Sequence, residues 1–154
     1  MSTAAADLER DLLATIPLAR AMALRVVAHE GDWLELAAPL APNINDKGCA
    51  FGGSLASLMT LAGWGVLHLA AAAHGLDCDI YVQDSTIRYL APVWGELRCR
   101  AQPAAGESCA DMLSALAARG KARLRMECAV ALPDGGVAAT LSARFVALRN
   151  AAAA

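Results

Sequence analysis

The chain has few charged and few aromatic side chains for its length of 154 residues. Only 18% of the residues are charged and 5% are aromatic, whereas 57% are hydrophobic. This balance leaves little polar surface, so we expect an oligomer that buries apolar area between its subunits. The net charge of −2 argues against a nucleic-acid-binding protein, because such proteins normally carry a marked basic excess.

The cysteines do not form the patterns of a disulfide framework or a zinc site. Their number is odd and no CxxC pair occurs: they are Cys49, Cys78, Cys99, Cys109 and Cys128. Such a set predicts reduced thiols that fill the core of a cytoplasmic protein. The three histidines lack the spacing of metal ligands, so we expect no metal. The first 20 residues mix charged and apolar side chains, which is not typical of a signal peptide.

One long segment carries no charged side chain at all. From Gly48 to Leu76 there is no Asp, Glu, Lys or Arg, and a segment of this length can cross a bilayer. The segment is rich in small residues, however, and is followed by strand patterns rather than by a basic flank. A helix that is apolar all round is also typical of the buried centre of a soluble domain. We therefore predict a central helix over about 52–74 and no membrane span.

The rest of the pattern predicts a single domain over residues 1–154. A short amphipathic helix is expected at about 4–18, followed by a hairpin of apolar runs at 24–28 and 33–37. Turn-forming residues fill a loop at 39–51. After the central helix, four strands are expected between about 80 and 148, at 80–90, 96–101, 119–132 and 137–148. A helical connector is expected at 108–118, between the second and third of these strands.

One early apolar helix followed by half-polar strands predicts an α+β fold. A curved antiparallel sheet wrapped around the helix would bury it, which is the hotdog arrangement. A sheet of this size cannot cover such a helix without leaving apolar area exposed. We therefore expect a homodimer or a higher even oligomer.

The segment Asn43-Ile44-Asn45-Asp46-Lys47-Gly48-Cys49-Ala50-Phe51-Gly52-Gly53-Ser54 places two glycines where the loop becomes the central helix. Free backbone N–H groups and the positive end of the helix dipole meet at such a start. The glycines let a substrate carbonyl approach the backbone closely. One interpretation is an oxyanion site of the kind that thioester chemistry requires. The other is an ordinary helix start with packing glycines.

Three motifs resemble the YiiD C-terminal domain family, a group of hotdog proteins labelled as thioesterases. They are Asn43-x-Asn45-x-Lys47-Gly48-x-x-Phe51-Gly52-Gly53-Ser54, Leu61-Ala62-Gly63-Trp64-Gly65 and Asp84-Ser85-x-Ile87-Arg88-Tyr89-Leu90-x-Pro92. The resemblance covers about residues 10–149. It implies a substrate carried on the phosphopantetheine of acyl carrier protein or coenzyme A, with no other cofactor. The family's hotdog domains include malonyl-acyl carrier protein decarboxylases that help to start fatty-acid synthesis.

The chain departs from the hydrolase pattern at two positions. Hydrolytic relatives of the phenylacetate-pathway type carry a histidine before the two glycines and a carboxylate seven residues after the second glycine. This chain has Phe51 and Thr60 there. A site without a carboxylate is poorly equipped to activate water, but it suits a substrate that brings its own negative charge. The departures favour decarboxylation of a malonyl thioester, with Asn45, Gly53 and Thr60 as its catalytic residues.

Two other functions remain open at this stage. Asp84, in the middle of a predicted strand, is either a solvated edge residue or the base of a thioesterase. The third possibility is a non-catalytic module that binds acyl thioesters.

Further substrate contacts follow from the resemblance and from one basic strand face. The resemblance implies contacts from Asn43, Phe51, Gly52, Ser54 and Ser85. Lys47 and Arg88 are further basic candidates for contact with a phosphate or a carboxylate and for docking of the carrier. The strand at 119–132 alternates basic and apolar residues, and Arg123 and Arg125 lie on its basic face. That face is either simply solvated or a docking surface for an acidic carrier protein or for the phosphates of coenzyme A.

Overall fold

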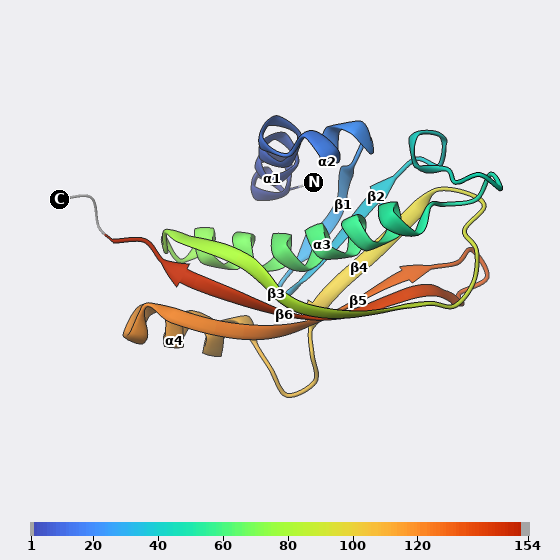
Figure 1. Cartoon of the computed structure of the whole chain (residues 1–154). Coiled ribbons are helices and arrows are strands. Elements are labelled where there is room, and N and C mark those ends of the chain that lie inside the picture. The colour runs from blue at the N-terminus through green and yellow to red at the C-terminus, as the bar shows by residue number, and fades with distance from the viewer. Residues whose placement is uncertain (1, 152–154) are drawn as a thin grey trace.

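The computed structural model describes residues 2–151 and begins with helices rather than with the sheet (Figure 1). The elements in chain order are α1 (Thr3–Thr15), α2 (Pro17–Ala21), β1 (Arg25–Glu30), β2 (Trp33–Ala38), a 3-10 turn η1 (Ala41–Asn43), α3 (Gly52–Ala73), β3 (Cys78–Tyr89), β4 (Leu97–Pro103), α4 (Cys109–Arg119), β5 (Lys121–Ala131) and β6 (Val137–Arg149). The predicted helix at 4–18 is divided in two because Pro17 disfavours a helical conformation at Ile16, whose φ is −113° and ψ is 100°.

The strands form one antiparallel sheet in the order β1-β2-β4-β5-β6-β3. The sheet curves, and α3 lies along one side of it (Figure 1). The side of the sheet that faces α3 is called the inner face below, and the opposite side the outer face. This arrangement confirms the predicted α+β fold, in which a long helix packs against a curved antiparallel sheet.

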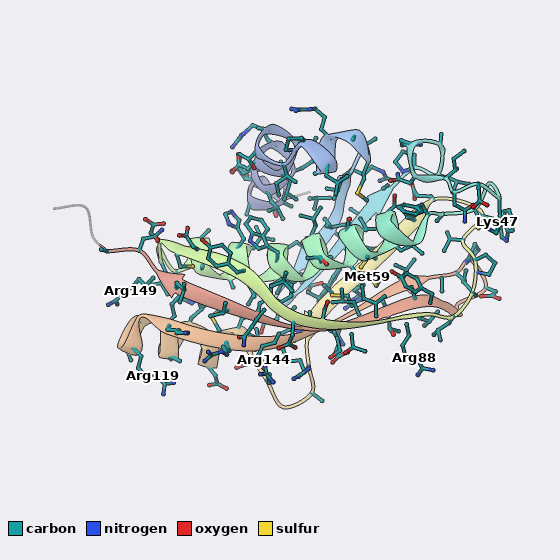
Figure 2. All side chains as sticks on the ribbon, viewed as in Figure 1. Lys47, Met59, Arg88, Arg119, Arg144 and Arg149 are labelled. Carbon is teal, nitrogen blue, oxygen red and sulfur yellow. The ribbon has the colours of Figure 1, made fainter. Side chains whose placement is uncertain are left out.

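α3 forms the centre of the core. Its buried side chains include Leu58, Met59 and Ala62, and Met59 points from the helix toward the sheet (Figure 2). Gly63 lies so close to the sheet that a Cβ atom on it would come within 2.8 Å of the Phe145 ring. By length and composition α3 resembles a membrane span, but 56% of its most apolar window is buried in the fold. No membrane span is therefore indicated.

α4 lies beside the first half of β5. β4 pairs with β5 only where Cys99–Pro103 faces Met126–Val130, so the earlier residues of β5 have no β4 partner. α4 contacts β5, β6 and α3 in this region and buries Met112, Leu113 and Leu116. The helix therefore covers the core where the two strands diverge.

β3 is an edge strand with a bulge. Val82 pairs with Phe145, but Asp84 pairs with Arg144, so Gln83 is an extra residue in the strand. A bulge of one residue exchanges the two faces of the strand beyond it. After the bulge, three residues of β3 pair with buried residues of β6 and so lie on the inner face: Ser85, Ile87 and Tyr89. The residues between them lie on the outer face: Asp84, Thr86 and Arg88.

Candidate functional site

The loop before α3 folds back on itself as a small hairpin. Ile44 pairs with Ala50, and the Asn45 N–H donates to the Cys49 carbonyl at 2.8 Å. The Asn45 Oδ1 accepts hydrogen bonds from the backbone N–H groups of Lys47 at 2.8 Å and Cys49 at 3.3 Å. Among the residues that the structure describes, the Asn45 Nδ2 donates only to the Cys49 Sγ, at 3.2 Å, and sulfur is a weak acceptor. The turn therefore uses the oxygen of this amide and leaves its nitrogen able to donate to a ligand.

α3 begins without a side-chain cap from any residue in the described range 2–151. Phe51 is the N-cap residue, and the Leu55 N–H makes the first helical bond, to the Phe51 carbonyl. The backbone N–H groups of Gly52, Gly53 and Ser54 precede that bond, so they have no acceptor within the helix. They lie at the positive end of the dipole of a 22-residue helix. The start of α3 thus offers hydrogen-bond donors suited to a developing negative charge.

Two aromatic rings flank the glycines at this start. A Cβ atom on Gly53 would lie 2.3 Å from the Phe51 Cε1, so the Phe51 ring rests directly on this glycine. A Cβ on Gly52 would lie 3.4 Å from the Tyr89 Cε1, and the Tyr89 hydroxyl donates to the Gly52 carbonyl at 3.2 Å. A cavity of about 370 Å³ opens here and is lined by Ala50, Gly52, Leu55, Tyr89, Leu90, Ala91 and Pro92. The site is therefore small and mainly apolar.

Asn43 anchors the loop from inside the fold. Its side chain is buried, and its Nδ2 donates to the carbonyls of Met22 at 3.0 Å and Pro39 at 2.7 Å. Its own carbonyl accepts the Phe51 N–H at 2.7 Å. Within the described chain its Oδ1 has no hydrogen-bond partner. Asn43 was predicted to contact substrate, and this buried oxygen is the one polar atom of its own side chain that is left without a partner in residues 2–151.

The hydroxyls on α3 are bonded to their own helix. The Thr60 Oγ1 donates to the Ala56 carbonyl at 2.9 Å, and the Ser57 Oγ donates to the Gly53 carbonyl at 2.8 Å. Thr60 lies about two turns along the helix from Gly53 and is half-buried. To donate to a substrate, Thr60 must give up its bond to Ala56.

Asp84 lies on the outer face and not beside the start of α3. Its Oδ2 is 4.0 Å from the Arg144 Nη1, and its side chain is 55% exposed. Arg144 projects from the side of the sheet opposite α3 (Figure 2). Within one chain the sheet separates Asp84 from Asn45 and the two glycines. Ser85, the next residue, is on the inner face.

The basic residues proposed for docking fall into two groups. Arg88, Arg123 and Arg125 lie on the outer face, where Arg123 donates to Gln83 at 3.0 Å and Arg125 to Ser142 at 3.4 Å. Lys47 lies instead at the tip of the loop before α3 and pairs with Asp46 at 2.8 Å (Figure 2). These four residues therefore do not form one continuous basic surface within a single chain.

The thiols and histidines show no sign of a nucleophile or a metal centre. All five cysteines are free, and burial raises the pKa of Cys99 well above its usual value. Burial beside Asp32 raises the pKa of Cys109 to about 12. Burial also lowers the pKa of His68, which stacks on Trp64. In residues 2–151 no group of His, Cys, Asp or Glu is arranged to hold a metal ion.

Sequence reasoning missed Tyr89 as a site residue. It was noted only as part of the motif that ends at Pro92, and strict alternation along β3 from Ile80 and Val82 would place it on the outer face. The bulge at Gln83 brings it to the inner face instead. No sequence signal that we used marks the position of that bulge.

Comparisons with known proteins agree with this geometry. Residues 5–149 match the sequence profile of the family described as "Putative thioesterase (yiiD_Cterm)". A protein of unknown function from Chlorobaculum tepidum is 30% identical over 95% of this chain and 94% of its own, with a TM-score of 0.87. A Shewanella oneidensis "putative thioesterase" is also 30% identical, over 96% of this chain and 99% of its own, with a TM-score of 0.85.

A third solved structure, a "probable thioesterase" from Pseudomonas aeruginosa, is 25% identical over 94% of this chain and 96% of its own, with a TM-score of 0.79. The descriptions of these relatives support the alternative prediction, a thioesterase, better than the main prediction, a malonyl-thioester decarboxylase. The match to the family extends over almost the whole chain and includes the loop, the glycines and both faces of β3. The chain belongs to the YiiD C-terminal family of thioesterase-like proteins in the hotdog superfamily.

Proposed function

We propose that this protein decarboxylates a malonyl thioester, whose carbonyl binds at the start of α3. The start of α3 combines hydrogen-bond donors that are unpaired within the helix with the absence of a catalytic carboxylate on the helix, and this combination supports the proposal. The backbone donors at Gly52 and Gly53 are uncapped, and α3 carries no carboxylate that could activate water. Asp84, the carboxylate of the third family motif, lies on the other face of the sheet beside Arg144.

The reaction itself needs electrostatic stabilisation rather than a base. The bond between C2 of the malonyl group and its carboxylate breaks, carbon dioxide leaves, and the electron pair enters the thioester as an enolate. The negative charge that develops on the thioester oxygen is stabilised by donors held in place beforehand. A proton from water then adds to C2 and gives the acetyl thioester.

Two groups of this chain are suited to that oxygen. The Gly53 N–H lies at the positive end of α3, and the Asn45 Nδ2 has only a weak sulfur acceptor. The apolar lining of the adjacent cavity disfavours the charged carboxylate and so favours its loss. A carboxylate on α3 would repel this substrate, which agrees with Thr60 at the position where hydrolytic relatives carry one.

Hydrolysis of an acyl thioester is the second candidate, and the family description favours it. The same donors would then stabilise a tetrahedral oxyanion. The base that activates water would have to be a group other than Asp84 of the same chain, because that side chain lies behind the sheet.

One assay separates the two reactions. The purified protein is incubated with malonyl-acyl carrier protein, and the carrier species are resolved by mass. We expect acetyl carrier to accumulate with little free carrier. Free carrier as the main product would overturn the proposal in favour of the thioesterase.

A variant makes the same distinction from within the site. Thr60→Asp adds the missing carboxylate, so we expect slower decarboxylation and, with neutral acyl thioesters, faster hydrolysis. Ala72→Asp, an exposed position near the other end of the same helix, is the control for adding charge to α3. If Thr60→Asp leaves decarboxylation unchanged, the malonyl carboxylate does not bind near this residue.

A further inference from the structure

We infer that Tyr89 is a positioning residue that orients and polarises the peptide group between Gly52 and Gly53. The inference rests on the proposed function, because it concerns the donor that would hold the thioester oxygen. The Tyr89 hydroxyl donates to the Gly52 carbonyl at 3.2 Å. That carbonyl and the Gly53 N–H belong to one planar peptide unit. A bond to one end of the unit therefore acts directly on the other end.

The first consequence is orientation. This peptide lies between two glycines, which adopt a wider range of backbone angles than other residues. It also lies in the first turn of α3, where the N–H side has no helical partner. The α-helical pattern places one donor on the Gly52 carbonyl, the Ala56 N–H, but a first turn frays more readily than the rest of a helix. The phenol, held by β3, adds a second donor to this carbonyl and so restrains the direction of the Gly53 N–H.

The second consequence is polarisation. Hydrogen bonds in a chain strengthen one another, by about 10–30% for each bond. A phenol that donates to the Gly52 oxygen draws electron density toward that oxygen and makes the Gly53 N–H a stronger donor. The gain is largest when the acceptor carries charge, which is the situation of the enolate. The effect should thus appear more in turnover than in substrate binding.

The structure favours this role over simple packing. The Tyr89 side chain is 56% exposed, so it contributes little to the core. Its ring lies 3.4 Å from the position of a Cβ on Gly52, which places the hydroxyl beside the backbone and at the edge of the cavity. The bulge at Gln83 is needed to bring the residue to this face.

The test compares Tyr89→Phe with Tyr81→Phe. Each variant loses one phenol oxygen from β3, and Tyr81 is 55% exposed, but Tyr81 lies on the outer face. We expect Tyr89→Phe to lower kcat about three- to tenfold and to change KM by less than about twofold. Tyr81→Phe should behave as the wild type. Equal kcat values for the two variants would overturn the assignment.

A spectroscopic measurement does not depend on turnover. Acetyl-coenzyme A labelled with ¹³C at the carbonyl is bound to each protein, and the carbonyl stretch is recorded by infrared difference spectroscopy. The wild type and Tyr81→Phe should shift the band to lower frequency, and Tyr89→Phe should shift it less. An equal shift in all three proteins refutes the role of Tyr89, and so does the absence of a shift in the wild type. A wild type that shifts the band but does not convert malonyl to acetyl carrier refutes the decarboxylase alone.

Discussion

Adding one methyl group at two positions of α3 should separate activity from stability. Gly53 and Gly63 are both helical glycines, and alanine favours a helix over glycine by about 0.5–1 kcal/mol. The two sites differ in what the methyl group would meet. At Gly53 it meets the Phe51 ring, which is 55% exposed and free to turn away. At Gly63 it meets Phe145, which is fully buried in the core.

For Gly53→Ala we expect a free energy of unfolding close to that of the wild type. Displacement of an exposed ring costs little, and the helix preference offsets it. The melting temperature should therefore change by less than about 2 °C. Activity should fall by about tenfold or more, because the methyl group and the displaced ring block the approach to the backbone donors.

For Gly63→Ala the opposite result is expected. Overpacking of a filled core costs about 1–3 kcal/mol and the gain in helix preference offsets about 0.5–1 kcal/mol, so the net loss is about 1 kcal/mol at mid-range and about 2.5 kcal/mol at most. In a chain of this length that loss lowers the melting temperature by about 2–10 °C. The kcat of the folded protein should be close to that of the wild type.

The assays are thermal unfolding followed by circular dichroism, and turnover measured well below both melting temperatures. If Gly53→Ala keeps full activity, the start of α3 does not bind the reacting carbonyl. If Gly63→Ala is as stable as the wild type, the core around Phe145 is looser than the contact distances imply.

Four further outcomes follow from the structure. Asn45→Asp keeps the oxygen that accepts the Lys47 and Cys49 N–H groups but removes the Nδ2 donor, so turnover should fall about 10²–10³-fold with little change in melting temperature; full activity would exclude Asn45 from the site. Arg123→Glu combined with Arg125→Glu should raise the KM for acyl carrier protein, and added salt should raise the KM of the wild type in the same way. Arg10→Glu on α1 is the control and should leave this KM unchanged. If neither the double variant nor salt changes the KM, the carrier does not dock on these arginines. Light scattering should give at least twice the mass of one chain at micromolar concentration, since β3 exposes a long free edge with Tyr81 and Val82; a stable monomer would contradict it. Burial lowers the pKa of His68, so the unfolded chain takes up a proton there before the folded chain does as the pH falls below about 6.5. The free energy of unfolding should therefore decrease from pH 7.5 to pH 5.5, and it should decrease less in His68→Gln than in His74→Gln. Equal pH profiles for the two variants would exclude His68 as the cause.

The sequence predicts the fold well where one local signal dominates. The uncharged run after Gly48 predicts α3 to within one residue at its end, because nothing in it interrupts a buried helix. The alternation of basic and apolar residues along β5 predicts a strand with one solvated face, as observed. Both signals come from neighbours in the chain, so no tertiary contact is needed to read them.

The site is less predictable because contacts between distant segments shape it. The burial of Asn43 depends on carbonyls of Met22 and Pro39. The contact between Tyr89 and Gly52 joins residues 37 positions apart. The face of Asp84 depends on one unpaired residue in β3. The catalytic roles of Asn45, Gly53 and Thr60 remain predictions. For each of them the structure adds the hydrogen bonds that the residue must keep or break in order to bind substrate.

The extra residue in β3 also has a consequence for evolution. Val82 and Asp84 pair with neighbouring residues of β6, so deletion of Gln83 would restore strict alternation and leave every other pair of the strand in place. Asp84 and Arg88 would stay on the outer face, and Tyr89 would stay beside the glycine pair. A relative that is one residue shorter here can therefore keep the same site and lose only the bulge. When relatives are aligned, a gap in this strand belongs at Gln83, because a gap elsewhere would offset the residues in between from their structural equivalents.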